Sequence, residues 1–419
     1  MNRIVVSGYY GSKNAGDEAM LAAMIEVLSE LDPQVNITVI SADPEDTRKR
    51  HGVRAVSWLS LREIVGALRS ADLLISGGGS LLQNVTSGRS LYYYLGVIWL
   101  AERLGVPVML YAQGIGPVCG GLARGLMRRI AGNVSLITVR DHGSYEEIDK
   151  LGIKKPPVLV TADPVLAIHP VDLSIGRGIL KKAKADGAKP VIGVSVREWR
   201  GWEHYKRMIA EAADRVAEEL DARIVFFPMQ VPEDVRTAET IAARMKRKAT
   251  VLTDEFTTGE LLSLVGNFDL LLAVRLHALI FAGVMGVPMV GVSYDPKIDR
   301  FLSSIGETAA GDLEHVAVDD ILARIREKWE GRAEFKKKNA ELLSDLRGLA
   351  ARNAELALEF IEKHKKTQYD DKTTAWENIS CGRSLHKKGA VLRLRLLLWC
   401  PNSDSNAGPP PCDDGALTN

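Results

Sequence analysis

The chain has 419 residues, of which 46% are hydrophobic, 26% charged and 6% aromatic, which excludes a coiled-coil rod, a collagen-like chain and a fully disordered chain. Lys plus Arg exceed Asp plus Glu by only one, 54 against 53, so no overall field draws the protein to nucleic acid or to an anionic membrane. A chain of this length forms two or three domains, each able to bury its own core.

Short β-branched runs alternate with helical patterns over residues 1–170, which is typical of βαβ units with a parallel sheet. The residues from Asp17 to Leu31 place their apolar side chains on one stripe with a 3.6-residue period, so we expect this helix to pack on the sheet. The strands expected here are 4–7, 36–40, 73–76, 106–112, 135–139 and 158–161. This pattern predicts a doubly wound α/β domain.

Residues 171–189 are dominated by Gly, Lys and Ala with little to bury, and we interpret them as a linker. The alternation then resumes over 190–332, with strands expected at 191–196, 223–227, 250–252, 269–274 and 288–292. Helix formers with interspersed apolar residues over 333–365 predict one or two closing helices. Residues 366–419 show no continuing pattern, and we expect a disordered or atypical tail. Two doubly wound domains imply a cleft, because ligands bind outside the carboxyl ends of the strands in such sheets.

The cellular location is read from features that the sequence lacks. The four cysteines, Cys119, Cys381, Cys400 and Cys412, show neither CxxC pairs nor the spacing of zinc ligands. The apolar run at the N-terminus is too short for a signal peptide, and the longest uncharged apolar stretch, 278–293, is too short to span a bilayer. We therefore expect a cytoplasmic protein without a transmembrane segment or a metal site.

Two glycine-rich segments follow strands of the first domain. Gly8–Glu18 leads into the first helix, where backbone N–H groups and the helix dipole can hold an anion or a sugar hydroxyl. Its glycines lack the GxGxxG spacing and the Gly-Lys-Ser/Thr of a P-loop, which disfavours nicotinamide or ATP binding. Asp17 could equally be an ordinary N-cap, whereas Asn14 is less easily explained as a cap. In the second segment, Gly77–Gly79, three consecutive glycines allow close backbone approach and favour a ligand-facing loop.

Basic side chains follow strands of both domains at the edge where the cleft is expected: Arg140, Arg197, Arg275 and Lys297. Arg140 could instead form a salt bridge with its neighbour Asp141. His277 begins a helix whose positive end lowers the pKa of an imidazole, although a lone histidine is more often structural. These residues predict a cationic cleft in a neutral protein, which suits a small polyanion. Other basic runs lack interleaved aromatic residues and read as solvated faces, so no nucleic-acid partner is expected.

The ordered set of segments resembles the polysaccharide pyruvyl transferase family, and most closely its bacterial cell-surface anchoring branch. The resemblance covers residues 2–365 and is carried by Gly8–Glu18, Gly77–Gln83, Tyr111–Pro117, Val139–Asp141, Thr161–Leu166, Arg275–Ala278 and Gly291–Lys297. It implies two Rossmann-like domains facing a cleft in a GT-B-like fold, phosphoenolpyruvate as donor, and formation of a pyruvate ketal on a sugar. In this branch the acceptor is an N-acetylmannosamine residue of a lipid-linked secondary cell-wall polymer precursor used in S-layer anchoring. The resemblance thus adds a peripheral contact with the inner face of the membrane.

The expected roles of the residues follow from the donor. Phosphoenolpyruvate carries a phosphate and a carboxylate, so it needs cationic anchors, which we assign to Arg140, Arg197 and Lys297. The expected catalytic residues are His277 and Arg275, with His277 either a general acid/base or only a phosphate ligand. The acceptor is expected near Asn14, Asp17, Gly78 and Gly79. We expect no cofactor beyond the donor substrate. The alternatives are a nucleotide-sugar glycosyltransferase of the same fold and a non-catalytic module that binds an anion.

Overall fold

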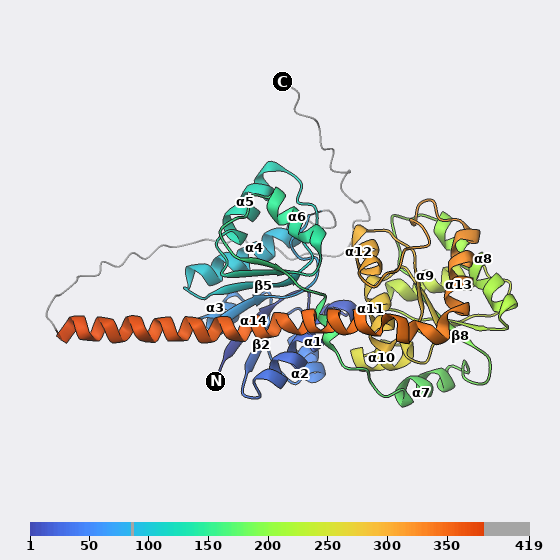
Figure 1. Cartoon of the computed structure of the whole chain (residues 1–419), viewed down its shortest axis with the longest axis horizontal. Helices are drawn as coiled ribbons and strands as arrows, with labels where there is room; N and C mark the ends of the chain where they lie inside the picture. The colour runs from blue at the N-terminus through green and yellow to red at the C-terminus, as the bar shows by residue number, and fades with distance from the viewer. Residues whose placement is uncertain (85–87, 381–419) are drawn as a thin grey trace, which may run out of the picture.

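The computed structural model describes residues 1–84 and 88–380, which form two α/β domains side by side (Figure 1). The N-terminal sheet has seven parallel strands in the order β3-β2-β1-β4-β5-β6-β7. Their bounds are β1 Arg3–Ser7, β2 Asn36–Ser41, β3 Arg54–Ser57, β4 Leu73–Ser76, β5 Val108–Gln113, β6 Leu136–Val139 and β7 Val158–Val160. The central strands are continuous apolar runs because helices cover both faces of the sheet.

The C-terminal sheet has five parallel strands in the order β10-β9-β8-β11-β12. Their bounds are β8 Val191–Ser195, β9 Arg223–Phe226, β10 Thr250–Val251, β11 Leu270–Ala273 and β12 Met289–Gly291. In both sheets the first strand of the chain lies inside the sheet. The next strands are added on one side of it and the later strands on the other side, as in doubly wound folds. The predicted fold class is therefore confirmed. The expected strands all form, with ends that differ by a few residues, and the short edge strand β3 was not predicted.

On one face of each sheet, helices of the same domain form an apolar core that is separate from the core of the other domain. In the N-terminal domain, α3 (Leu61–Arg69), α4 (Gly88–Arg103), α5 (Gly121–Ala131) and α6 (His142–Lys150) pack on one face. In the C-terminal domain, α8 (His204–Glu219), α9 (Glu233–Ala242) and α13 (Val318–Glu330) pack on one face of the smaller sheet.

The opposite faces of the two sheets share one continuous core. This core joins α1 (Ala15–Leu31) and the 3-10 helix η1 (Pro164–Ala167) to α10 (Thr258–Val265) and α11 (Leu276–Met285). Met20 and Val165 of the first domain and Leu261 and Leu279 of the second are all buried in it. A shared apolar core holds the two carboxyl edges in a fixed relation, because separating the domains would expose it to water.

The segment predicted to be a linker contains helix α7 (Ser174–Lys182) rather than extended chain. Leu180 is buried, and the backbone N–H of Gly176 donates to Ser263 Oγ at 2.8 Å. A Cβ on Gly176 would lie within 3 Å of the backbone of α10, so the glycine lets the two helices approach closely. The apolar residues Ile175, Ile179 and Leu180 are too few to give a clear period among the lysines and glycines.

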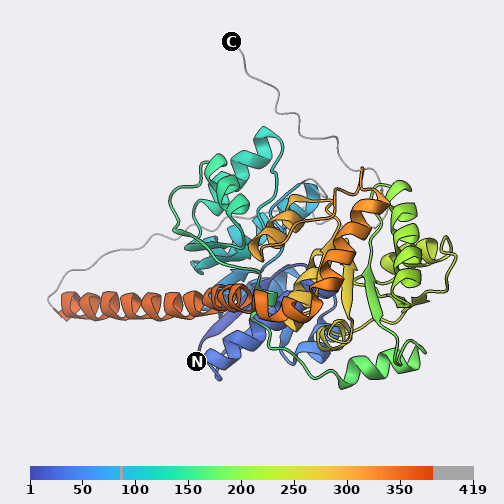
Figure 2. The same cartoon turned by 45° about the vertical axis from the view of Figure 1, so that its right-hand side comes forward.

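The closing helices are α13 and α14 (Arg332–Ser380), and α14 runs past the C-terminal domain and then the N-terminal domain (Figures 1 and 2). Early in α14, Leu343 lies against Gly283 of α11. Further along, Asn353 is fully buried, and its Oδ1 accepts a hydrogen bond from Thr161 Oγ1 at 2.8 Å. The helix continues beyond Lys365, where the sequence led us to expect a patternless tail, and the remainder of that tail, 381–419, lies outside the described residues.

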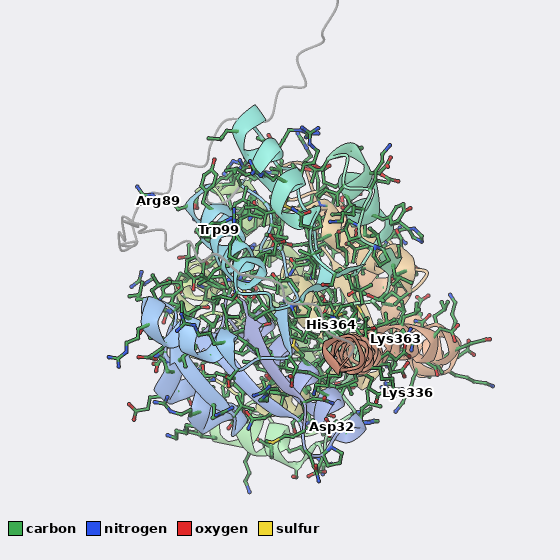
Figure 3. All side chains as sticks on the ribbon, turned by 90° about the vertical axis from the view of Figure 1, so that its left-hand side faces the viewer. Asp32, Arg89, Trp99, Lys336, Lys363 and His364 are labelled. Atoms are coloured by element: carbon green, nitrogen blue, oxygen red, sulfur yellow. The ribbon has the colours of Figure 1, made fainter. Side chains whose placement is uncertain are left out.

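The remaining helices are α2 (Pro44–His51) beside β2 and β3, and α12 (Pro296–Ser304) after β12. Figure 3 looks almost along α14 and labels two of its residues, Lys363 and His364. Within the described ranges, every helix lacks the combination of length and apolar character that a bilayer span requires.

Candidate active site between the two sheets

The loops that face each other across the domains leave both sheets at their switch points. In the N-terminal sheet, β1 and β4 are neighbours, and the chain turns away from them in opposite directions. In the C-terminal sheet, β8 and β11 have the same relation. Ligands bind at this position in doubly wound sheets. The glycine-rich segments follow β1 and β4, whereas Arg197 and Arg275 follow β8 and β11.

The two edges are in direct contact at the beginning of α1. The backbone N–H of Ala15 donates to the carbonyl of Met229 at 2.8 Å, and Asn14 forms an isolated antiparallel bridge with Gln230. A Cβ on Gly16 would lie 2.6 Å from Cγ and 2.7 Å from Cε1 of His277. The missing side chain of Gly16 therefore lets the imidazole of the second domain lie on the first turn of α1.

Asn14, not Asp17, is the N-cap of α1. Its Oδ1 accepts from the backbone N–H groups of Gly16 at 3.0 Å and Asp17 at 3.4 Å. The interpretation of Asp17 as an ordinary cap is thus wrong, and the Asn14 carboxamide oxygen is occupied by the helix terminus rather than open to a sugar.

The glycines Gly78 and Gly79 differ in what they face. A Cβ on Gly78 would meet Met20 and Pro164, so this side of the glycine faces protein. Gly79 has φ +104°, and a Cβ there would lie 3.3 Å from Asp17 Oδ1. The loop after β4 therefore passes closely over the carboxylate of Asp17.

Arg140 is held by residues of its own domain. Its guanidinium donates to Asp163 Oδ2 at 2.8 Å and to Ser80 Oγ at 3.1 Å. It lies over Gly114, where a Cβ would come within 2.6 Å of Nη2. The alternative of a bridge to Asp141 is wrong, because Asp141 instead caps α6 and pairs with Arg300 of the second domain at 3.1 Å.

Arg275 and His277 flank the beginning of α11, where Arg275 is the N-cap residue. Arg275 forms a buried ion pair with Asp234, which also accepts from the backbone N–H groups of Met229 and Gln230 at 3.0 Å each. The imidazole Nε2 of His277 lies 3.8 Å from Asp163 Oδ2. Asp163 thus lies between Arg140 of its own domain, with which it forms an ion pair, and His277 of the second domain.

Arg197 and Lys297 meet around one aromatic side chain. Arg197 Nη1 donates to the hydroxyl of Tyr294 at 2.5 Å, and the guanidinium lies 4.7 Å from the centroid of that ring. Lys297 lies 5.3 Å from the same centroid and pairs with Asp295 at 3.2 Å. The ring of Trp199 packs against Tyr294 with centroids 4.6 Å apart. These contacts fix both cations by cation–π interactions.

The structure thus brings together the predicted cations, but each has a partner. Asp163, Asp234 and Asp295 neutralise Arg140, Arg275 and Lys297, and Tyr294 accepts from Arg197. The cleft is therefore less positive than the sequence predicted, because strand-end carboxylates accompany the basic residues.

Several buried nitrogens in this region still lack a partner. Arg197 Nε, Arg275 Nε and His277 Nε2 are buried and form no hydrogen bond within the part of the chain that the structure describes. Unsatisfied buried polar atoms are rare, because each costs roughly 1–3 kcal/mol. All three lie at the carboxyl edge of the C-terminal sheet, where the oxygen atoms of a ligand would satisfy them.

The titratable groups of the cleft have shifted pKa values. Burial, reinforced by the charges of Arg140, Lys297 and Arg275 and opposed by Asp163, lowers the pKa of His277 to about 4. Burial and the neighbouring Glu18 raise the pKa of Asp17 to about 7, against the pull of the same three cations. The imidazole is therefore neutral at neutral pH, whereas the carboxyl of Asp17 is only partly ionised.

Tyr294 shows the opposite balance. Its burial favours a raised pKa, yet Lys297, Arg197 and Arg275 together lower the pKa of the phenol below its ordinary value. This response shows how strongly the three cations act on a group placed between them.

Sequence reasoning assigned no role to Gly16, Asp163, Asp234 or Tyr294. Asp163 and Tyr294 lie inside segments that carried the family resemblance, so a signal for them existed. Asp234 lies in α9, far from Arg275 in sequence, and the packing of α9 decides this pairing.

A surface groove and one potential ligand cluster lie away from this site. A groove of about 720 Å³ beside Trp99, Phe360 and His364 opens at the amino ends of β5 and β6, the far edge of the sheet. Glu26, Glu30 and His169 place three potential metal ligands within 4.8 Å of one another, but Glu30 and His169 are exposed. Exposed groups of this kind are common without a metal and assign no function.

The family model for polysaccharide pyruvyl transferase matches residues 14–296, more than half of the chain. The protein belongs to the polysaccharide pyruvyl transferase family. The matched range includes Asn14, Asp17, Arg140, Arg197, Arg275 and His277, and it ends one residue before Lys297. A relative of this chain is the amylovoran biosynthesis protein AmsJ of Erwinia amylovora, 21% identical over 282 residues, which are 63% of this chain and 67% of that protein.

Solved structures similar to this chain show a GT-B fold. The UDP co-structure of Staphylococcus aureus MnaA aligns with a TM-score of 0.62 at 12% identity, covering 87% of this chain and 97% of that one. UDP-GlcNAc 2-epimerase of Neisseria meningitidis, bound to UDP-GlcNAc, aligns with 0.57 at 14% identity over 87% and 100% of the two chains. Anabaena HepE in complex with UDP-glucose aligns with 0.56 at 12% identity over 88% and 100%. At these identities the likeness concerns the fold alone.

Proposed function

We propose that this protein transfers the enolpyruvyl group of phosphoenolpyruvate to two hydroxyls of a sugar, forming a pyruvate ketal and releasing phosphate. The observation that carries the donor assignment is the set of buried, unsatisfied nitrogens Arg197 Nε, Arg275 Nε and His277 Nε2. Phosphoenolpyruvate offers phosphate and carboxylate oxygens, and guanidinium groups suit both as charge-assisted donors. Family membership supports the reaction class.

The donor-binding cations are preorganised by their partners. Asp163 and Ser80 fix Arg140, Asp234 fixes Arg275, and Tyr294 fixes Arg197. Donors that are already oriented stabilise developing charge on the departing phosphate without reorganisation cost. Lys297 supplies a further cation beside Tyr294.

His277 is proposed to act as a neutral group. With a pKa of about 4 it carries no charge at neutral pH, which argues against a role as a cationic phosphate anchor. Its Nε2 is instead available to hydrogen-bond the donor or to accept the proton of an acceptor hydroxyl, and a bound polyanion would raise its basicity.

The acceptor is proposed to be an N-acetylmannosamine residue of a lipid-linked secondary cell-wall polymer precursor, met at the inner face of the membrane. This assignment follows from the resemblance of the matched segments to the cell-surface anchoring branch. Because Asn14 caps a helix and Gly78 faces protein, the acceptor is placed beside Gly79 and Asp17 rather than on all four predicted residues.

The donor assignment is tested by calorimetric titration with phosphoenolpyruvate and, separately, with UDP. We expect the wild type to bind phosphoenolpyruvate and not UDP, and Arg275→Ala to bind it at least about tenfold more weakly. Arg215→Ala, which removes an exposed surface pair with Asp319, is the control and should bind like the wild type.

Two results contradict the proposal. UDP binding without phosphoenolpyruvate binding would indicate a nucleotide-sugar enzyme, the activity class of the structural neighbours. Phosphoenolpyruvate binding without phosphate release, in the presence of a lipid-diphosphate-linked saccharide ending in N-acetylmannosamine, would indicate an anion-binding module.

A further inference from the structure

Asp17 lies at the centre of the site. It is the third residue of α1, directly after Gly16, where the imidazole of His277 lies in the space that a Cβ would need. Its Oδ1 approaches the position that a Cβ of Gly79 would take, at 3.3 Å. The carboxyl group therefore lies between the loop after β4 and the first turn of α11.

No structural duty occupies this carboxyl group. Asn14 caps the helix, and the three other aspartates of the cleft, Asp163, Asp234 and Asp295, each pair with a cation. Within residues 1–84 and 88–380, the carboxylate of Asp17 forms neither a hydrogen bond nor an ion pair, although the residue is partly buried.

We propose that Asp17 is the acid that protonates the methylene carbon of the donor. This inference rests on the proposed function and deepens it, because it replaces His277 as the source of that proton. The sequence had placed Asp17 only on the acceptor side.

The protons and electron pairs of the reaction balance. The carboxylic O–H of Asp17 gives its proton to C3, the C2=C3 π electrons form the new C3–H bond, and an acceptor hydroxyl oxygen donates its lone pair to C2. That hydroxyl's proton returns to the Asp17 carboxylate. The bond between C2 and the bridging phosphate oxygen then breaks, and its electrons leave with the phosphate. A second hydroxyl oxygen forms a bond to C2. The proton of the second hydroxyl ends on the phosphate, so donor and diol yield ketal and hydrogen phosphate.

The surroundings explain why Asp17 can hold a proton that His277 cannot. The carboxyl group has a pKa of about 7, near the working pH that favours an acid catalyst, whereas the imidazole, with a pKa of about 4, is already deprotonated. A bound trianionic donor would raise both values further. The charged and titratable groups that act on Asp17 come from three helices and from the loops after β1, β6 and β11: Tyr9, Tyr10, Glu18, Tyr94, Arg140, Arg275 and Lys297. His277 lies beside the preceding residue, Gly16, and is itself acted on by Asp163.

The test compares Asp17→Asn and Asp17→Glu with the wild type. Asp17→Asn keeps the shape and removes the proton, so we expect phosphoenolpyruvate affinity within about threefold of wild type and a kcat lower by about 10²–10⁴-fold. Asp17→Glu should recover part of the rate. The wild-type rate should fall as pH rises through about 7, and this limb should be absent from the residual rate of Asp17→Asn. The control is Asp43→Asn, because Asp43 only caps α2 and Asn caps equally well.

The outcomes separate this inference from the proposed function. A wild type that binds phosphoenolpyruvate but releases no phosphate with the N-acetylmannosamine-terminated lipid diphosphate overturns the proposed function, and this step with it. An active wild type whose Asp17→Asn variant keeps its kcat within threefold, or keeps the alkaline limb, overturns the role of Asp17 alone.

Discussion

Replacing Gly16 by Ala sets local helix preference against the contact between the domains. Ala is favoured over Gly in a helix by at most about 1 kcal/mol, so local preference predicts a stabilised protein. The new Cβ, however, would lie 2.6 Å from Cγ of His277. Carbon atoms pack at roughly 3.5 Å or more, so the ring or the helix must move by at least about 0.9 Å, and Nδ1 of the ring lies closer still.

This displacement should outweigh the gain in helix propensity. Overpacking a buried contact costs about 1–3 kcal/mol, so we expect Gly16→Ala to lower the free energy of unfolding measured in urea. A shift of about 1 Å in a reacting group costs roughly a hundredfold in rate, so phosphate release should fall by about that factor.

Two further variants make the reasoning refutable. Gly66→Ala, at an exposed position in α3 with open space around its Cβ, should stabilise by about 0.5–1 kcal/mol. Combining Gly16→Ala with His277→Ala should relieve the clash and recover stability without recovering activity. A Gly16→Ala variant as stable as Gly66→Ala, with unchanged turnover, would show that His277 does not lie on α1.

Three other predictions concern stability. Asp17→Asn should raise the melting temperature more at about pH 8 than at about pH 4. The pKa of the Asp17 carboxyl is raised to about 7 in the folded protein, so the wild type loses stability as pH rises from the ordinary carboxyl pKa to 7, and the variant does not. Equal shifts at both pH values would contradict this. Asp234→Asn should cost about 3 kcal/mol in urea unfolding, since it leaves the buried Arg275 without its anion, and a loss below 1 kcal/mol would show that the pair is solvated. Asn353→Leu removes the bond from Thr161 and should cost about 1–3 kcal/mol, with phosphoenolpyruvate affinity unchanged in calorimetry; an unchanged unfolding midpoint would show that Asn353 does not anchor α14.

The sequence by itself determined the fold class and most of the strand positions. Apolar runs of strand length between amphipathic stretches carry this information locally, because both faces of a parallel sheet must be covered. β3 and α7 escaped, since a four-residue edge strand and a lysine-rich helix bury too little to leave a clear pattern. The continuation of α14 beyond Lys365 escaped as well. The order of the elements also placed Arg140, Arg197, Arg275, His277 and Lys297 at strand ends.

Only the tertiary structure decided how these residues pair and titrate. The partners of Arg140 and Arg275, which are Asp163 and Asp234, lie 23 and 41 positions away in sequence, and packing alone selects them. The contact of His277 with Gly16 joins two domains, so no local pattern reports it. The pKa values of Asp17 and His277 move in opposite directions because burial disfavours the charged form of each, an anion in one and a cation in the other.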